Sequence, residues 1–458
     1  MSLLSSLIIG RSALKAADAG VNTTSHNVAN ATTLGFHRRR VDYTTADPVR
    51  RGRHWYGRGV NTNELVRVAN RFVGMRMVSQ AGEESAASTM YTALTSVETL
   101  FDETDSEGMR QKLDVFFDSL MSSTADPSDL SLRQGVTFAG EQLSRVVRDT
   151  GKSLQTSMSD FSTNVKDSLG QVNDKLSEVA AINLRLFTSG GVQAAGDLAD
   201  QRDQIIQELA EAVGVTVHLG TDGQATVFMG GHAIVSGGAA RTLSLDGSGT
   251  TPKVLVSLDN SSLDVTSSLG GKAGASLETW NLTNGYLDEL NTFAKDFASA
   301  LNTQHAGGFD QSGTAGGTMF NVIAGQEATT INFDSVLLDE PSKLAYAAAV
   351  TAEAGDDGNL QALLNLESAS IISATATAGQ WLSNLTGHVA IDMGRARAVA
   401  DQEETKLADL HELNHNLSGV DLDEEAGNLI MYQAAYQAAA KVITTSNQML
   451  GTLMQLVG

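Results

Sequence analysis

The chain has 458 residues, with 31 Lys and Arg against 53 Asp and Glu, and this length predicts roughly two to four domains. The net charge of −22 argues against a nucleic-acid-binding protein, because phosphate contacts need a basic surface. The absence of cysteine excludes disulfides, thiolate metal sites and cysteine nucleophiles. No run of about 18 apolar residues predicts membrane insertion, and the first residues do not predict a cleaved signal peptide.

The first 30 residues predict a helix with a narrow apolar stripe. Apolar or small residues recur at alternating spacings of four and three, at Leu3, Leu7, Gly10, Leu14, Ala17, Val21, Thr24 and Val28. This period of 3.5 residues is typical of the seam of a coiled coil. The Asn, Thr and Gly residues between Asn27 and Phe36 predict that the helix stops near Asn30 and that the chain turns at Gly35.

Residues 37–63 are rich in Arg, Gly and Thr and predict an extended segment. The first 80 residues hold 12 of the 31 Lys and Arg but only four of the 53 acids. The run from His37 to Arg40 can be a solvated loop, a nucleic-acid patch or a contact with acidic neighbours in an assembly. The net charge of the chain disfavours the nucleic-acid interpretation.

The middle of the chain predicts long helices. From Leu132 to Leu186 apolar residues step by three or four without a proline, which predicts one helix of about 55–60 residues and about 80–90 Å. Such a helix needs long partners, and three segments have suitable patterns: residues 197–213, 278–304 and 357–417. The first of these opens with a cluster of aspartates, at Asp197, Asp200 and Asp203. We expect these carboxylates to complement the helix dipole.

Between the helices the period of the apolar residues changes from helical to alternating. Residues 213–265 are rich in Val, Thr and Gly, and turn signals such as Asp222-Gly223 and Gly230-Gly231 predict hairpins. We therefore predict a small antiparallel β domain at residues 212–275. A second segment rich in loops and strands is expected near residues 307–344.

The pattern His411-Glu412-Leu413-Asn414-His415 fits the H-E-x-x-H motif of zinc peptidases. On a helix the two imidazoles would share one face and could hold Zn²⁺, with Glu412 as the general base. However, Ser418 and Asp421 occupy the positions where metzincins carry a glycine and a third histidine, and a compact catalytic domain is not recognisable around the motif. An exposed helical face is the favoured interpretation, so we expect no metal, no cofactor and no catalytic residue.

The C-terminal residues predict a second seam. Every seventh residue is apolar or aromatic, at Leu422, Leu429, Tyr436, Ile443, Leu450 and Val457. Neither terminal stripe can bury itself alone, so the two ends are predicted to meet each other or their copies in neighbouring subunits. If the two helices pair antiparallel, the basic residues 38–40 lie at the same end as the acidic residues 421–425.

These patterns predict an α+β multidomain protein. Its expected parts are a terminal coiled-coil domain (1–36 with 418–458), a helical rod domain (37–211 with 276–417) and the inserted β domain. The terminal domain should carry the assembly interface, with these candidate residues: Leu3, Leu7, Leu14, Val21, Asn27, Asn30, Gly35, Phe36, Leu422, Leu429, Tyr432, Tyr436, Ile443 and Leu450. This organisation is typical of an assembly protein rather than of an enzyme with a pocket.

Several runs of residues resemble those of a known family. Residues 5–14 and 27–36 resemble the N-terminal signature shared by bacterial flagellar rod, hook and hook-associated proteins. The C-terminal runs at residues 418–429 and 432–443 look most like those of the family members at the junction between hook and filament. The run Asp197 to Asp203, the residues around Val215, and the run from Ser123 to Gln134 are also similar to the interior of those junction proteins.

The resemblance implies a structural subunit of the flagellum without enzymatic activity. It implies a homo-oligomeric ring whose paired termini line an inner wall, with the hook protein and the next hook–filament junction protein as neighbours. It also implies an export chaperone at the C-terminal region, and an extracellular location reached through the flagellar export channel without a cleaved signal. The alternatives are a hook or distal rod protein and, more remotely, a secreted zinc peptidase that uses residues 411–415.

Overall fold

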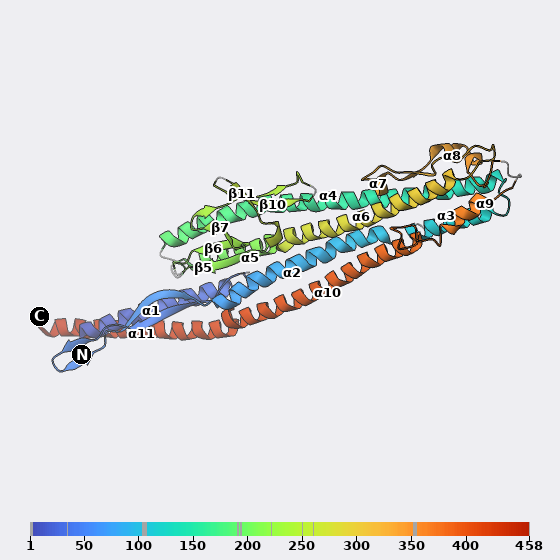
Figure 1. Cartoon of the computed structure of the whole chain (residues 1–458). Helices are drawn as coiled ribbons and strands as arrows, with labels where there is room; N and C mark the ends of the chain where they lie inside the picture. The colour runs from blue at the N-terminus through green and yellow to red at the C-terminus, as the bar shows by residue number, and fades with distance from the viewer. Residues whose placement is uncertain are drawn as a thin grey trace.

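The computed structural model of the chain describes residues 3–33, 35–102, 108–189, 192, 195–220, 222–249, 251–259, 261–350 and 355–457. Long helices lie side by side in an elongated body, and both termini lie at one end of the molecule (Figure 1). The helices are α1 Leu3–Ala29, α2 Arg71–Glu98, α3 Met109–Ser123, α4 Leu130–Thr188, α5 Gly196–Val213, α6 Gly271–Ala306, α7 Glu327–Thr330, α8 Ser335–Asp339, α9 Gly358–Asn365, α10 Ala378–Ser418 and α11 Leu422–Val457.

Short strands lie between these helices. They are β1 Arg39–Thr45, β2 Val49–Arg51, β3 His54–Tyr56, β4 Val60–Arg67, β5 Thr216–Leu219, β6 Ala225–Met229, β7 His232–Ser236, β8 Ala239–Ala240, β9 Leu243–Asp246, β10 Lys253–Leu258, β11 Ser261–Asp264, β12 Phe320–Asn321 and β13 Asn332–Phe333. All of the paired strands run antiparallel in the part of the chain that is described. The predicted α+β class, with long helices and small antiparallel sheets, is confirmed.

The helix α4 contributes buried side chains to both of the large hydrophobic clusters of the body. Its 59 residues correspond to about 88 Å, and its N-cap Asp129 accepts a hydrogen bond from the backbone N–H of Ser131. Its buried side chains recur every three or four residues along the whole length, as the sequence predicts. One half of α4 packs with α3 and α6, and the other half packs with α5 and the strands β5 to β11.

An aromatic cluster fills the half of the body that lies far from the termini. Its members are Phe116, Phe117, Phe293, Phe297, Phe320 and Phe333, which are at most 2% exposed. Neighbouring rings have centroids 5.1–6.5 Å apart, mostly edge to face. Each such pair adds about 0.5–1.5 kcal/mol beyond the burial of its area. The loops around β12 and β13 are therefore fixed onto α3 and α6.

The β unit consists of a four-stranded sheet, β5-β6-β7-β8, and a three-stranded sheet, β11-β10-β9. Gly230 and Gly231 have φ angles of +55° and +79° and form the two-residue turn between β6 and β7 that the sequence predicts. Two asparagines of α4 fix the strands by pairing with their backbones. The side-chain amide of Asn183 donates to the carbonyl of Ala225 at 2.8 Å and accepts from its N–H at 2.9 Å. The amide of Asn173 donates to the carbonyl of Leu243 at 2.9 Å and accepts from its N–H at 2.8 Å.

The chain enters and leaves the β unit at a narrow neck. Gly214 ends α5 in the left-handed conformation, with φ +68°. A Cβ atom added to Gly214 would lie only 2.5 Å from the Cα atom of Gly270, which precedes α6. The N–H of Gly270 also donates to the carbonyl of Val213 at 3.0 Å. The chain thus leaves and re-enters the helical body at one point.

The segment with a helical pattern at residues 357–417 is divided into two helices. The chain forms α9, then a turn, then α10. Ser373 and Ala374 have φ angles of +49° and +55° in this turn, and such angles are incompatible with a right-handed helix. Thr377 and Gln380 form a capping box at the start of α10, and this local signal marks the boundary.

His305 is fully buried in the loop-rich half of the body and holds two segments together as a neutral ring. Its Nδ1–H donates to the carbonyl of Gly317 at 2.7 Å, and its Nε2 accepts from the N–H of Ala345 at 2.9 Å. Burial lowers the pKa of His305 below its ordinary value of 6.5. The unfolded chain therefore binds a proton at this residue before the folded chain does.

This difference predicts a loss of stability in mild acid. The contribution of neutral His305 is complete well above pH 6.5 and falls as the pH drops through 6.5 toward the lower pKa of the folded state. His305→Asn, which keeps one donor and one acceptor, should be less stable at pH 7.5 but should lose less stability on acidification. Urea unfolding of both proteins at the two pH values measures this, and equal losses would contradict the prediction.

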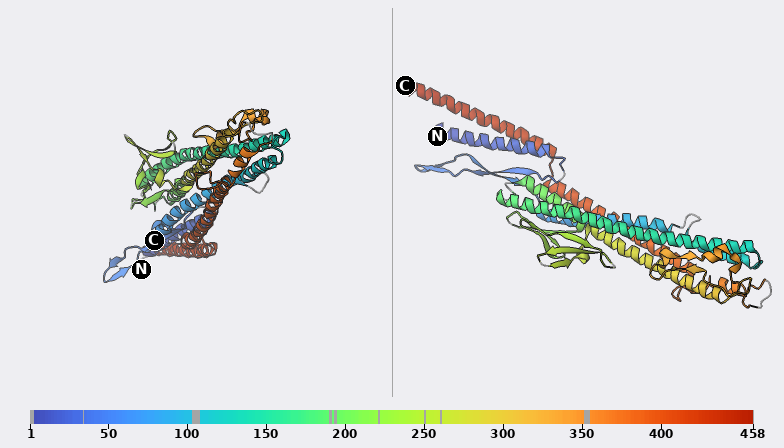
Figure 2. Two further views of the ribbon diagram at one scale, coloured as in Figure 1. Left: turned by 45° about the vertical axis from the view of Figure 1, so that its right-hand side comes forward. Right: turned by 90° about the horizontal axis from the view of Figure 1, so that it is seen from above.

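The terminal helices extend away from the body. Figure 2 shows α1 and α11 side by side beyond the ends of α2 and α10, with the N- and C-termini at the same extremity. The predicted extended segment at residues 37–63 forms a long hairpin: β1 pairs with β4, and β2 pairs with β3 at its tip. The helix α10 ends at Ser418, and α11 begins after Gly419, Val420 and Asp421. This short link separates the terminal pair from the body.

Candidate assembly interface

The terminal pair is an antiparallel contact between α1 and α11. A Cβ atom added to Gly20 would lie 2.6–2.7 Å from three ring carbons of Tyr432, and one added to Gly10 would lie 3.0 Å from Ile443 Cγ1. The two glycines thus allow the larger side chains of α11 to pack closely on α1. Tyr43 of β1 joins this contact, since its hydroxyl donates to the carbonyl of Ala16 at 3.0 Å. Burial, and then the neighbouring Tyr432, raise the pKa of Tyr43.

The candidate interface residues of α1 line this contact to different degrees. Leu7, Leu14 and Val21 are partly buried, whereas the side chain of Leu3 lies outside the described part of the structure. Asn30 is partly buried and accepts a hydrogen bond from Thr33. Gly35 is exposed and has a φ of +77°, which suits the turn expected there. These positions come together at the terminal pair, and their role in an assembly stays a prediction.

Phe36 follows the turn and packs between two side chains. Its ring centroid lies 5.5 Å from that of His26 and 5.5 Å from the guanidinium carbon of Arg39.

Asn27 is only 1% exposed and joins three segments. Its amide donates to the Arg39 carbonyl at 2.9 Å and to Glu425 Oε1 at 3.2 Å, and it accepts from the Arg39 N–H at 3.0 Å. Asn27 therefore fixes the start of β1 against both terminal helices.

In α11 two rows of residues face α1. The predicted residues Leu429, Ile443 and Leu450 are partly buried, but Leu422 and Tyr436 are 54% and 42% exposed in the single chain. The most buried row recurs every seventh residue and contains Glu425, Tyr432, Ala439 and Ser446. Of this row only Tyr432 is a candidate from the sequence. Its other members are acidic, small or hydroxylated, so an apolar repeat does not reveal them.

The acidic start of α11 binds the basic residue that follows the turn. Arg38 Nε donates to Glu425 Oε1 at 2.7 Å, and its Nη1 donates to Glu424 Oε2 at 2.9 Å. Glu425 is 2% exposed, whereas Glu424 is 55% exposed. The hydrogen bond to Glu424 is the main cause that raises the pKa of Arg38. The expected meeting of the two charged clusters thus occurs for Arg38 within one chain.

Arg39 does not take part in this meeting, because it binds a different segment. Its guanidinium forms an ion pair with Asp197 and lies 3.7 Å from Asp200 Oδ2. The expectation that the aspartates at the start of α5 act through the helix dipole is therefore incomplete. They bind side chains from the residues between α1 and α2, which we call the terminal segment.

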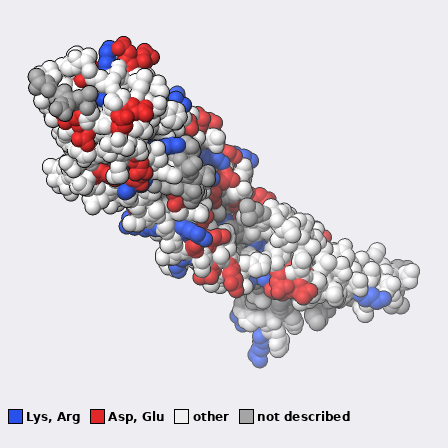
Figure 3. Space-filling view, turned by 90° about the vertical axis from the view of Figure 1, so that its right-hand side faces the viewer, with Lys and Arg blue, Asp and Glu red and all other residues white. Residues whose placement is uncertain are grey.

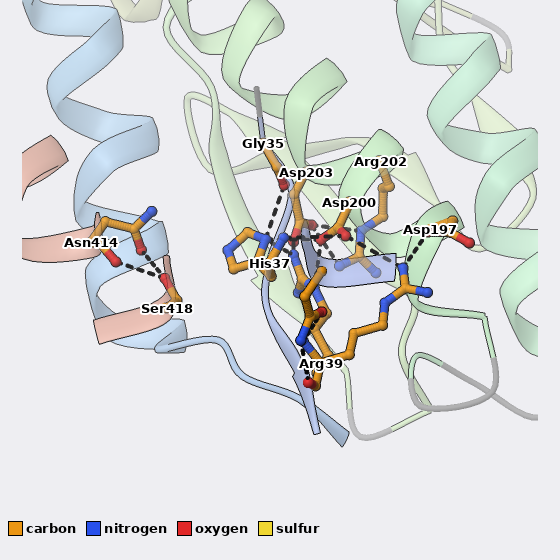
Figure 4. Close-up of polar contacts among 11 residues, drawn as sticks. Gly35, His37, Arg39, Asp197, Asp200, Arg202, Asp203, Asn414 and Ser418 are labelled. Atoms are coloured by element: carbon orange, nitrogen blue, oxygen red, sulfur yellow. Dashed lines mark hydrogen bonds and ion pairs between the residues drawn. The ribbon is translucent and has the colours of Figure 1, made fainter. Parts of the chain in front are cut away.

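Asp200 and Asp203 form a terminal latch with His37 and Arg67. Figure 4 shows His37 beside the two aspartates. Asp200 Oδ1 lies 2.8 Å from His37 Nδ1 and accepts from Arg67 Nε at 2.7 Å. Asp203 accepts from Arg67 Nη2 at 2.7 Å and from Arg202. Except for Asp203, which is 29% exposed, these side chains are at most 16% exposed. The terminal latch ties β4 and the segment before β1 to α5 of the body.

The contact between Arg38 and Glu425 leads to a prediction about paired substitutions. Arg38→Met leaves the buried Glu425 carboxylate without its arginine and should destabilise the terminal pair by about 3–5 kcal/mol. Arg38→Met with Glu425→Gln should recover most of this loss, because glutamine is neutral and can still accept from Asn27. Hydrogen exchange of α1 and α11 measures both effects. Glu424→Gln is the matched control, since an exposed pair contributes only about 0–1 kcal/mol.

The H-E-x-x-H residues lie on an exposed turn of α10. His411, Glu412 and His415 are exposed, and His411 and His415 line a groove of about 900 Å³ between the terminal segment, α2, α5 and α10. Among the described residues, no group of three His, Cys, Asp or Glu side chains could hold a metal ion. In the same part of the chain no helix is both long and apolar enough to cross a membrane.

Comparisons with known families agree with this arrangement of helices. Residues 94–320 match the family model described as flagellar hook-associated protein FlgK helical domain. Residues 416–456, which include α11, match the model described as flagellar basal body rod FlgEFG protein C-terminal. The two matched regions correspond to much of the body and to the C-terminal half of the terminal pair.

Similar proteins cover nearly the whole chain. Flagellar hook-associated protein 1 of Bacillus subtilis is 26% identical, and the match covers 98% of this chain and 97% of that protein. The protein of the same name from Escherichia coli is 24% identical, with 97% and 98% covered. The solved structure of the flagellar hook junction protein FlgK from Burkholderia pseudomallei has a TM-score of 0.64 at 14% identity and covers 74% of this chain and 99% of that one. The helical body, the terminal pair and these matches together show that the chain belongs to the flagellar hook-associated protein 1 family of structural proteins of the bacterial flagellum.

Proposed function

We propose that this chain forms a homo-oligomeric ring on the distal end of the flagellar hook, where it connects the hook protein to the next hook–filament junction protein. The observation that carries this proposal is the terminal pair, whose outer faces are apolar and uncovered in the single chain. The family membership supports the flagellar setting, and the terminal pair supports the proposed means of assembly.

The uncovered surface follows both terminal helices. Each of the following large apolar side chains is at least 42% exposed: Leu4, Ile8 and Val28 of α1, and Leu422, Ile430, Met431, Tyr436, Val442, Met449, Leu453 and Met454 of α11. Two helices can bury only the sides that face each other, so these side chains need neighbours. Burial of apolar surface contributes about 25 cal/mol per Å². Copies packed around a common axis would cover this surface and form the inner wall of a tube.

The same surface supports the proposed export partner. An exposed apolar helix face promotes aggregation before assembly, and α11 carries the larger share of that face. An export chaperone at the C-terminal region would cover it until the subunit reaches the flagellar tip. We further propose that the chain is exported through the flagellar channel without a cleaved signal and functions outside the cell.

The proposal is tested with isolated hooks. Purified chain should bind only at the distal ends of the hooks, and the capped hooks should then accept the next junction protein, as seen by electron microscopy with labelled proteins. Hooks without this chain should not accept that protein. Growth of this chain into long tubes would favour the alternative of a hook or rod protein. An absence of binding to hook ends would contradict the proposed function.

A further inference from the structure

The hairpin beside the terminal pair carries a projecting tip that we call the basic arm, residues 46–58. The part of the hairpin formed by β1 and β4 contacts α1, where the N–H of Val60 donates to Ser12 Oγ at 3.3 Å. The tip projects beside the two termini, away from the body (Figures 1 and 2). The described side chains from Asp47 to Arg50 and from Arg53 to Trp55 are exposed. An isolated two-stranded hairpin is at best marginally stable in water.

The composition of the basic arm is that of a binding surface. It contains Arg50, Arg51, Arg53 and Arg58 and a single acid, Asp47. Arg50, Arg53 and Arg58 make no ion pair with the described residues. Trp55 is 66% exposed at the tip. Exposed tryptophan and arginine are the residue types that most often dominate the binding energy of protein interfaces.

The acidic partner surface is present on the body of the same chain. Beyond residue 80 the chain holds 49 of its 53 acids, and Figure 3 shows acidic patches distributed over the face of the molecule that it presents. Glu84 of α2, Glu211 of α5 and Glu404 of α10 come together on one side of the body. Burial, followed by repulsion from Glu211 and Glu404, raises the pKa of Glu84. Lys272 of α6 opposes this effect, but one lysine beside three carboxylates leaves the surface where α2 packs with α5 and α10 acidic.

One chain cannot make this contact with itself. The basic arm points toward the extremity that carries both termini, whereas α2 and α10 run from the terminal pair in the opposite direction (Figure 1). A contact between two different surfaces of identical copies is heterologous, and such contacts generate rings and helical tubes. The charges of the two surfaces are opposite, so a second copy fits the basic arm.

We propose that the basic arm of one copy binds the acidic surface around Glu84, Glu211 and Glu404 on the body of a neighbouring copy. This inference rests on the proposed ring assembly and adds to it a second contact, which lies outside the terminal helices. The arginines then meet the carboxylates, and Trp55 packs on the helices between them. The contact joins the terminal domain of one copy to the body of another.

Cross-linking tests the contact directly, because the chain has no cysteine of its own. Chains with Trp55→Cys and chains with Glu404→Cys are mixed, assembled on isolated hooks and treated with a short bismaleimide. Covalent dimers should form between the two variants after assembly and not in dilute monomer. Ser262→Cys, an exposed position on β11, replaces Glu404→Cys in the control and should give no dimer with Trp55→Cys.

Charge reversal tests the physical basis of the contact. Arg50→Glu with Arg53→Glu and Arg58→Glu should slow assembly at least about tenfold, more at low than at high salt. Adding Glu211→Arg and Glu404→Arg to the same chain should restore most of the rate. The control reverses three exposed basic residues of the body, Lys152, Lys166 and Arg241, and should assemble nearly normally.

The outcomes distinguish this inference from the proposed function. If wild-type chain caps hooks but the cysteine pair gives no dimer, or if the reversed basic arm assembles as fast as its control, the inference is overturned while the proposed function stands. If wild-type chain does not bind hook ends at all, the proposed function fails. Dimers at the Trp55–Glu404 pair together with charge rescue would support the contact.

Discussion

Ile443→Asp is expected to abolish the addition of the chain to isolated hooks while the melting temperature of the body changes by little. Ile443 packs against Gly10 in the terminal pair, and a carboxylate there would be buried without a partner at a cost of several kcal/mol. In the part of the chain that the structure describes, none of the hydrophobic clusters of the body contains this residue. Hook capping, followed by electron microscopy, and calorimetry of the monomer measure the two effects.

Ile391→Asp is the matched control for this experiment. Ile391 is 59% exposed on α10, so the same substitution creates no buried charge. Assembly and melting temperature should both remain close to those of the wild type. Leu429→Asp should behave like Ile443→Asp, since Leu429 lies in the same row of α11. A large fall in the melting temperature of the body with Ile443→Asp would mean that the terminal pair belongs to the core of the monomer.

Asp200→Ala is expected to release the terminal segment from the body. The substitution removes the carboxylate that lies against both His37 and Arg67 in the terminal latch. Because these groups are mostly buried, the loss should destabilise the contact by about 3 kcal/mol. Hydrogen exchange should accelerate in residues 35–45 and in the first turns of α5. Capped hooks should be shorter-lived, since the terminal pair is then less firmly oriented relative to the body.

Asp409→Ala is the corresponding control, because Asp409 is an exposed carboxylate of α10. It should change neither hydrogen exchange nor capping. Unchanged exchange in Asp200→Ala would show that the remaining contacts of Arg67 with Asp203 suffice to hold the terminal segment.

The long helices and the β unit could be predicted because their signals are local and periodic. Apolar residues step by three or four along α4 for its whole length, and paired glycines with positive φ mark the turn between β6 and β7. The division between α9 and α10 was missed, since the residues on both sides have helical patterns. The division depends on the left-handed backbone at Ser373 and Ala374, and neither serine nor alanine predicts that conformation.

The pairing of the chain ends could also be predicted, but many of its polar contacts could not. Arg38 meets the start of α11 because an antiparallel pair places both at one end. Arg39 is its immediate neighbour in sequence and instead binds Asp197, which lies 158 residues further along the chain. A count of charges cannot assign such partners. The burial of Glu425 is explained by its contacts with Arg38 and Asn27, which are far from it in the sequence.

The narrow neck at Gly214 and Gly270 brings the two ends of the β unit together, so the whole unit is one excursion of the chain from the helical body. The entropic cost of closing a loop rises only with the logarithm of its length, so a longer excursion costs the helices little as long as the strands that pack on α4 and α5 are kept. The length of an exposed turn of this unit, such as residues 247–249, can therefore vary while the packing of the helices stays the same. For the same reason a foreign domain whose own termini lie close together can be inserted at that turn, which would turn the flagellum into a scaffold for displaying that domain at a defined position.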